Sequence, residues 1–152
     1  MNRRCLYCYQ PLDGHQYDFH TACSRKMFGH PLAPLLPYSD HHLEPLAAEV
    51  IRNSTAVTGV QPKLSLHIGA PDGDTLAQRF TIVGLWGGYI LKPPSPIYPQ
   101  LPELEDLTMH LASLARIPTA QHSLIPLQSG ALAYITKRMD RGKKHKLHME
   151  DM

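Results

Sequence analysis

Beyond residue 60, the chain carries short runs in which apolar and polar residues alternate. In the first run, Leu64, Leu66 and Ile68 fall on one face, because successive strand side chains point to opposite sides of a sheet. Turn-forming residues at 71–75 and 128–130 join the first two runs and the last two runs into hairpins. The pattern predicts five strands, at residues 62–69, 77–84, 89–92, 121–127 and 131–139.

Apolar residues spaced by three or four predict two helices, at residues 43–53 and 103–116. Asp40 is a possible cap for the first helix, and Glu103, Glu105 and Asp106 suit the positive end of the second helix dipole. The residues that line one side of each helix are Leu43, Leu46, Ala47 and Val50 in the first and Leu104, Leu107, Leu111 and Leu114 in the second. The element order predicts an α+β fold, with one main helix on an antiparallel sheet.

Length, charge and hydropathy restrict the class of protein. The 152 residues suffice for one domain, or for a small module joined to a modest domain. A formal net charge of +2 is too small to argue for a nucleic acid or an anionic membrane as partner. No apolar run is long enough for a membrane helix, and the first residues lack the apolar core of a signal peptide. We therefore expect a cytoplasmic protein.

The three cysteines cluster near the start of the chain and suggest a metal site. Cys5, Cys8, His20 and Cys23 follow the spacing C-x2-C-x11-H-x2-C, which suits four tetrahedral ligands of Zn²⁺. His15 is an alternative to His20. One alternative is a disulfide with one free thiol, which the odd cysteine count and a cytoplasmic setting disfavour. The other is that the cysteines are buried and unrelated to one another. Four protein ligands would make a closed, structural zinc site, and so short a segment would depend on the metal to fold.

A lysine at the end of the third predicted strand precedes a helix with an acidic first turn. This is the layout of a protein-kinase N-lobe, where a strand lysine contacts the nucleotide phosphates and a helix glutamate positions it. The loop at 58–63 precedes the first two strands, where a kinase covers the phosphates with backbone N–H groups. The alternative is that the acidic residues only complement the helix dipole, since the loop matches no standard phosphate-binding motif.

Five segments occur in the order and spacing of a known family. They are TGVQPKLSL, YILKPP, LPELEDLTMHLA, YITKRMDR and LHMED. Together they resemble the N-lobe of the HipA-like serine/threonine kinases, the toxins of bacterial toxin–antitoxin systems. The start of the chain, CLYCYQPL and YDFHTACSRKMFG, resembles the zinc-finger-like beginning of the shorter, HipT-type branch.

The resemblance implies three parts and a set of nucleotide contacts. The parts are a zinc-knuckle module at 1–29, a proline-rich linker with a short helix at 30–53, and the kinase N-lobe at 54–152. Lys92 matches the ATP-contacting lysine, and Glu105 matches the acid that positions it. The remaining matches are Thr58, Gly59, Val60, Gln61, Pro62 and Lys63 in the phosphate-covering loop and Lys137, Arg138 and Met139 in the hinge.

Two departures from the family pattern change what the resemblance implies. Ala56 stands where the family has an autophosphorylated serine, which leaves Thr58 as the best candidate for that modification. The catalytic and magnesium-binding residues of the family would follow Met152, in a C-lobe. We therefore expect a truncated lobe that is inactive alone, with ATP and Mg²⁺ bound only in the full-length kinase.

The resemblance also implies partners. They are a HipS-like small protein, a HipB-like DNA-binding antitoxin, and a protein substrate such as an aminoacyl-tRNA synthetase. Two other interpretations stay open. One is a non-catalytic lobe that binds an antitoxin or another partner. The other is a zinc-ribbon nucleic-acid-binding protein, which the lack of a clear basic stripe disfavours.

Overall fold

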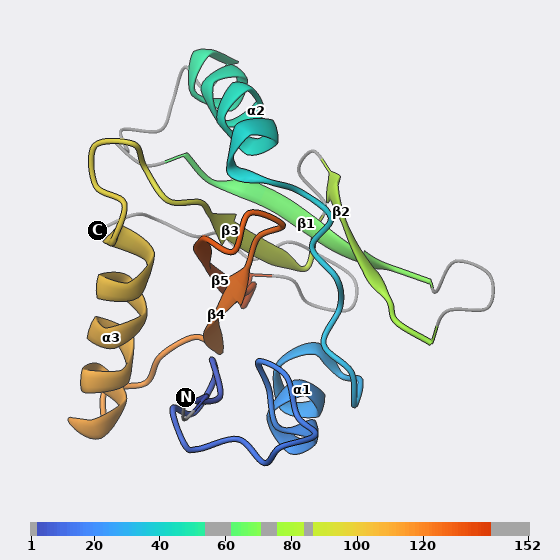
Figure 1. Cartoon of the computed structure of the whole chain (residues 1–152). Coiled ribbons are helices and arrows are strands. Elements are labelled where there is room, and N and C mark those ends of the chain that lie inside the picture. The colour runs from blue at the N-terminus through green and yellow to red at the C-terminus, as the bar shows by residue number, and fades with distance from the viewer. Residues whose placement is uncertain (1–2, 54–61, 71–75, 84–86, 141–152) are drawn as a thin grey trace.

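The computed structural model describes residues 3–53, 62–70, 76–83 and 87–140 (Figure 1). Within these residues, two helices precede three strands, and a third helix and two more strands follow, which is an α+β arrangement as predicted. The elements are α1 (Thr21–Phe28), α2 (Asp40–Asn53), β1 (Leu64–Gly69), β2 (Arg79–Val83), β3 (Tyr89–Lys92), α3 (Leu101–Leu114), β4 (His122–Pro126) and β5 (Leu132–Lys137).

The five strands form one antiparallel sheet in the order β2-β1-β3-β5-β4. Both predicted hairpins are confirmed, because β1 pairs with β2 and β4 pairs with β5. In the centre of the sheet, β3 pairs with β5, so that Lys92 lies opposite Tyr134 and Tyr89 lies opposite Lys137. The predicted phosphate contact, Lys92, therefore lies at one end of this strand pair, and the predicted hinge, which begins at Lys137, lies at the other end.

One face of the sheet is apolar and packs against the N-terminal segment. Phe28 of α1 meets Phe80 of β2 with ring centroids 5.9 Å apart, and Phe80 meets Tyr89 of β3 at 5.4 Å. The hydroxyl of Tyr89 donates a hydrogen bond to the carbonyl oxygen of Met27. The side chains that alternate onto this face and join the core are Leu64, Leu66, Leu91, Ala133 and Ile135.

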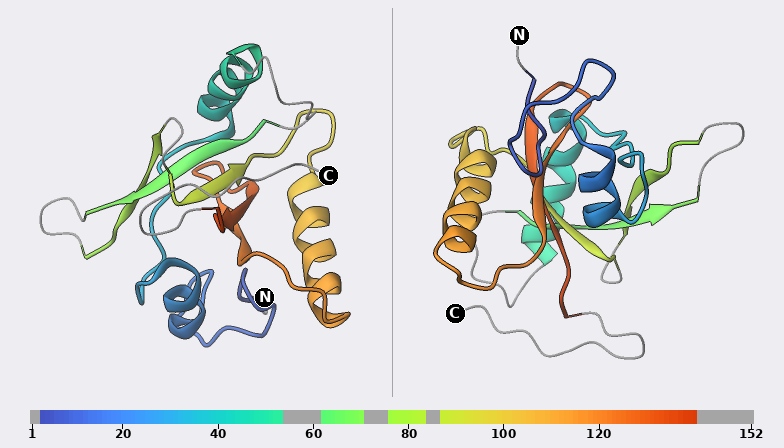
Figure 2. Two further views of the ribbon diagram at one scale, coloured as in Figure 1. Left: turned by 180° about the vertical axis from the view of Figure 1, so that it is seen from behind. Right: turned by 90° about the horizontal axis from the view of Figure 1, so that it is seen from below.

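The opposite face of β4 and β5 is covered by α3 and carries both polar and apolar side chains. Figure 2 shows α3 on one side of these strands and α1 on the other. Asp106 of α3 is fully buried against this face, close to His122 of β4. Strand alternation therefore separates an apolar core face from a face that carries titratable groups.

The N-terminal segment and the proline-rich linker are attached to the sheet by backbone bonds. The carbonyl oxygen of Leu6 accepts bonds from the N–H of Leu124 and the hydroxyl of Ser123 in β4. In the linker, Leu35 forms a parallel bridge with Arg79 beside β2. Cysteine and aromatic side chains of the first 28 residues belong to the same core as the sheet. The boundaries at residues 29 and 53 stay a prediction.

The structure differs from the sequence pattern in its helices. The helix α1 was not predicted, and an isolated antiparallel bridge joins Arg4 to Pro11 before it. In α2, Leu43 is fully buried, but Leu46 of the predicted apolar side is 37% exposed. The leucine side of α3 faces away from the sheet. Its exposed fractions are 58% for Leu104, 46% for Leu107, 56% for Leu111 and 81% for Leu114.

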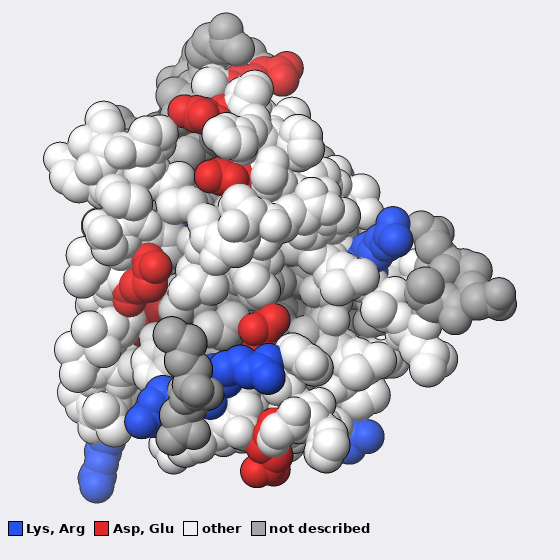
Figure 3. Space-filling view, viewed as in Figure 1, with Lys and Arg blue, Asp and Glu red and all other residues white. Residues whose placement is uncertain are grey.

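None of the helices in the described ranges is both long and apolar enough to cross a membrane. On the face drawn in Figure 3, basic and acidic side chains of the described residues are interspersed among uncharged ones.

Candidate functional site

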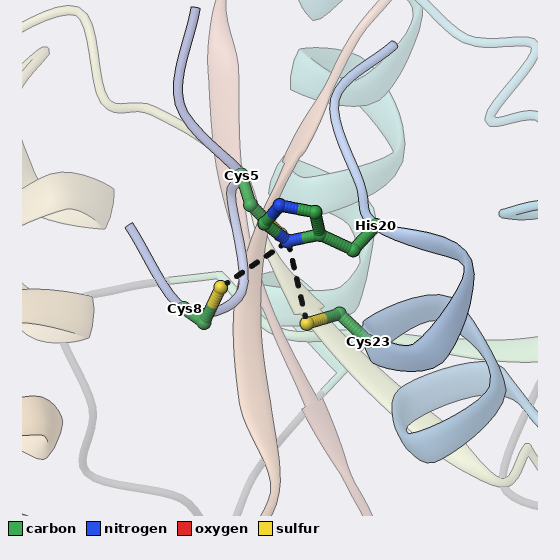
Figure 4. Close-up of side chains that lie close together, drawn as sticks. All are labelled: Cys5, Cys8, His20 and Cys23. Atoms are coloured by element: carbon green, nitrogen blue, oxygen red, sulfur yellow. Dashed lines mark hydrogen bonds between the residues drawn. The ribbon is translucent and has the colours of Figure 1, made fainter. Parts of the chain in front are cut away.

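The four predicted metal ligands converge on one point (Figure 4). Cys5 and Cys8 lie on the N-terminal loop, His20 directly precedes α1, and Cys23 lies in its first turn. All four ligand atoms lie within 4.8 Å of one another. The Nδ1 atom of His20 is 3.4 Å from Sγ of Cys8 and 3.8 Å from Sγ of Cys23. His15 is exposed and is not part of the group.

The imidazole of His20 is oriented for metal binding through Nδ1. Its Nε2–H donates to the carbonyl oxygen of Pro11 at 2.9 Å, which raises the pKa of His20 above its usual value. A ligating histidine commonly donates its second nitrogen to a backbone carbonyl in this way, because the bond fixes the ring and its tautomer. The nitrogen that faces the three sulfur atoms is therefore the one with a free lone pair.

The electrostatics of the sulfur atoms also suit a bound cation. Burial by itself raises the pKa of Cys5, but backbone N–H groups, that of His20 foremost, outweigh it and lower the pKa to about 7. The pKa of Cys23 rises to about 12, because the thiol is buried and lies close to Cys8 and Cys5. Three thiolates cannot coexist here without a compensating positive charge, which a metal ion would supply.

A second group of charged residues lies between β3 and α3. Lys92, the last residue of β3, donates from Nζ to a carboxylate oxygen of Glu105, the partner that the sequence indicated. Both side chains are about one-fifth exposed, at 19% and 23%. The ammonium group also lies 5.5 Å from the ring centroid of Tyr134 in β5. Burial raises the pKa of Tyr134, as does the negative charge of Glu105, so its hydroxyl stays neutral beneath the ion pair.

The predicted hinge follows β5 at the other end of the strand pair. Lys137 and Lys92 are three register positions apart across β3 and β5, which corresponds to about 10 Å along the strands. The backbone N–H of Lys137 donates to Gln121, and that of Arg138 donates to Gly88. The guanidinium of Arg138 forms two bonds with the nearly buried carboxylate of Asp140. Met139 between them is exposed.

The remaining predicted contacts are only partly described. Thr58, Gly59, Val60 and Gln61 lie outside the described residues, whereas Pro62 and Lys63 directly precede β1. A cavity of about 700 Å³ opens between α2, the segment after β3 and the start of α3. Pro62 and Glu103 line it, but Lys92 and Glu105 do not. We therefore do not assign a nucleotide to this cavity.

Sequence reasoning missed a buried network around Asp106. One carboxylate oxygen accepts from the hydroxyl of Tyr9, and the other lies 2.6 Å from Nδ1 of His122. Nε2 of His110 lies 3.4 Å from the same carboxylate. Two ligands of one ion would be about 2.9–3.3 Å apart at ordinary metal–ligand distances, so the 2.6 Å contact indicates a shared proton. The signal in the sequence was an acid beside Glu105 with a histidine four residues later.

Comparison with known proteins shows the family of the chain. The family model for the HipA-like C-terminal domain matches residues 55–152, which is more than half of the chain. A Haemophilus influenzae protein named "Putative kinase" is 28% identical over 124 residues. That match covers 78% of this chain but 34% of the relative, so the chain spans about a third of the relative's length. The chain belongs to the HipA-like C-terminal domain family.

Proposed function

We propose that this chain is the ATP-binding lobe of a HipA-like serine/threonine protein kinase. The observation that carries the proposal is the ion pair between Lys92 and Glu105. In protein kinases a strand lysine held by a helix glutamate contacts the α- and β-phosphates, because a fixed cation stabilises charge there during phosphoryl transfer. The pair lies on β3 and α3, as that role requires, and the family membership supports it.

The geometry of the strand pair suggests how the nucleotide lies. The phosphates would contact Lys92 and the segment of Pro62 and Lys63 that directly precedes β1. The adenine would reach the segment Lys137, Arg138 and Met139, about 10 Å away along β3 and β5. The chain supplies one side of such a site, and the acceptor and magnesium contacts would come from a C-lobe. Mg²⁺ would therefore bind in the full-length kinase.

We further propose that the Cys5, Cys8, His20 and Cys23 group binds a structural Zn²⁺. Tetrahedral Zn²⁺ at ordinary bond lengths places a sulfur and a nitrogen ligand about 3.6 Å apart, and the structure has 3.4 and 3.8 Å. Three thiolates and an imidazole suit zinc better than Ca²⁺ or Mg²⁺, which prefer oxygen ligands. With four protein ligands the ion would have no open position, so it would stabilise the fold without taking part in phosphoryl transfer.

The cellular role is proposed from the family resemblance. The protein would act as a toxin that phosphorylates a translation component such as an aminoacyl-tRNA synthetase. A HipS-like small protein and a HipB-like antitoxin would bind it, and Thr58 would be the site of autophosphorylation.

A non-catalytic partner-binding lobe is the second candidate function, and the exposed leucine side of α3 favours it. If it is correct, Leu107→Lys should abolish binding of a HipS-like or HipB-like protein encoded beside this gene, and Lys92→Met should not. The kinase proposal expects a different result, in which Lys92→Met removes an enzymatic activity.

The DNA that follows the codon for Met152 distinguishes the kinase function from the non-catalytic, partner-binding function. A segment that encodes the catalytic aspartate, in the same or a shifted frame, supports the kinase. The joined protein should then autophosphorylate, and Lys92→Met should lower the rate by about 10²-fold or more while the fold is retained. Unrelated DNA would exclude the enzyme for the native protein, and full activity of Lys92→Met would show that the lysine has another role.

A further inference from the structure

Tyr9 connects the proposed metal site to α3. It directly follows the ligand Cys8, and its φ of 60° places it in the left-handed region that the tight turn requires. Its backbone N–H donates to the carbonyl oxygen of Cys5 at 2.9 Å. The position of Tyr9 is therefore fixed by two proposed ligands, Cys8 through the chain and Cys5 through this hydrogen bond. The ring packs on His110 of α3, with centroids 4.5 Å apart.

The hydroxyl of Tyr9 reaches a buried charge in the middle of α3. It donates to Oδ2 of Asp106, whose side chain is completely buried. Oδ1 of the same carboxylate accepts from His122 of β4 at 2.6 Å. Asp106 is therefore held from two sides, by a residue of the metal-binding turn and by a residue of the sheet. A bond to a buried carboxylate is worth more than an ordinary hydrogen bond, because the charge would otherwise lack compensation.

The next residue toward the N-terminus of α3 is Glu105, the partner of Lys92. A helix is stiff over one turn, so a bond that fixes Asp106 also fixes where the Glu105 side chain begins. We propose that Tyr9 is a positioning residue: through Asp106, the metal-binding turn holds α3 in the place where Glu105 meets Lys92. Its consequence for ATP rests on the proposed function, whereas the mechanical connection does not.

Amide hydrogen exchange tests the connection without any nucleotide. Tyr9→Phe keeps the ring and the metal ligands but removes the bond to Asp106. Tyr17→Phe is the matched control, because it makes the same change at an exposed ring of the same segment. With one zinc retained per chain, Tyr9→Phe should raise exchange rates in residues 101–114 by about tenfold or more, the size expected for a bond to a buried charge. Exchange in β1 and β2 should change little.

Three results would overturn the inference. They are unchanged exchange rates of α3 in Tyr9→Phe, an equal rise of these rates in Tyr17→Phe, and a rise in exchange that is spread evenly over α3 and the sheet. Asp106→Asn weakens the same hydrogen bond by changing its acceptor on α3. It is the variant to use if Tyr9→Phe does not retain its metal. It should raise exchange in residues 101–114 in the same way, and unchanged rates in it would equally contradict the proposal.

A second measurement asks whether the connection matters to the Lys92 pair. The affinities of ATP and adenosine are measured in the full-length kinase for the wild type, Tyr9→Phe, Glu105→Gln and the double variant. Tyr9→Phe should lower the affinity for ATP several-fold and leave the affinity for adenosine unchanged. In the double variant it should lower the affinity for ATP little further than Glu105→Gln alone does. Independent, fully additive effects would contradict the positioning role. If Lys92→Met and Glu105→Gln leave ATP binding unchanged, the proposed function fails, and hydrogen exchange still decides the connection.

Discussion

Glu105 and Asp106 are adjacent in α3, yet their carboxylates bind partners on different strands of the sheet. Glu105 pairs with Lys92 at the end of β3, and Asp106 accepts from His122 in β4. Asp106 is also bound by Tyr9, which belongs to the metal-binding turn. Two neighbouring acids thus join the proposed nucleotide contact, the sheet and the N-terminal segment through one helical turn.

This arrangement explains the unusual orientation of α3. Its inward side is polar, since Asp106 is buried and His110 and Glu105 are half-buried. A helix cannot present both that side and its leucine side to the same sheet, because the two point in different directions. The side that carries the Asp106 hydrogen bonds and the Lys92–Glu105 pair therefore faces the sheet, and the leucines remain outside.

Leucine substitutions test that rotation. Leu114→Ala should change the free energy of unfolding by no more than about 0.5 kcal/mol, because the side chain is exposed and alanine is a good helix former. Leu91→Ala should cost about 2–5 kcal/mol, because Leu91 is fully buried in the core. Urea unfolding of both variants measures the difference. A similar loss of unfolding free energy in Leu114→Ala and Leu91→Ala would mean that α3 packs with its leucines inward.

Two consecutive glycines before β3 should respond differently to alanine. A β-carbon at Gly87 would overlap the carbonyl oxygen of Leu66 and the hydroxyl of Ser65, whereas one at Gly88 meets nothing within 4 Å. We expect Gly87→Ala to lower stability by about 1–3 kcal/mol, because backbone cannot move aside as a flexible side chain can. Gly88→Ala should be close to neutral. Thermal unfolding compares the two variants. Equal changes in their melting temperatures would be inconsistent with the close contact of Gly87 with β1.

The proposed zinc site makes a prediction about two histidines. Native mass spectrometry should find one Zn²⁺ per chain in the wild type and in His15→Ala, because His15 lies outside the ligand group. His20→Ala removes a ligand and should lose the metal or bind it much more weakly. Retention of zinc by His20→Ala together with its loss in His15→Ala would reverse the assignment.

Metal removal should also affect the rest of the fold. Cys5, Phe19, Met27 and Phe28 share the core with the sheet, so the segment that the metal organises is part of the main packing. A strong chelator should therefore lower the melting temperature of the whole chain, measured by circular dichroism in the sheet and helix signals together. An unchanged melting temperature after verified metal loss would show that the ligand group is not structural.

Much of the fold could be predicted from local pattern. Strands such as β1 were placed because their alternation has period two, and turn residues fixed the hairpins. The four metal ligands could be chosen from spacing, and Glu105 could be paired with Lys92 because both fell at the ends of neighbouring elements. These features depend on short stretches of sequence, where periodicity and spacing carry information.

The rest depends on contacts between distant segments. The bond from Tyr9 to Asp106 joins residues 97 positions apart, and no spacing rule relates them. The leucine side of α3 was expected to be a buried stripe in the usual way, but the buried hydrogen bonds of Asp106 and the Lys92–Glu105 pair lie on the other side and face the sheet. The helix α1 is only eight residues long, too short to show a clear helical period, and Met27 and Phe28 anchor it in the core.

The central claim is that Lys92, held by Glu105, contacts the phosphates of ATP. An NMR titration of the isotope-labelled chain, joined to the C-lobe that completes the proposed site, tests it most directly, because chemical shifts locate the nucleotide on particular residues. ATP should shift the amides around Lys92, Lys63 and residues 137–139, adenosine should shift only the last group, and Lys92→Met should remove the phosphate-dependent shifts. No saturable shifts, shifts centred on the cavity beside α2, or shifts that persist unchanged in Lys92→Met would contradict the claim.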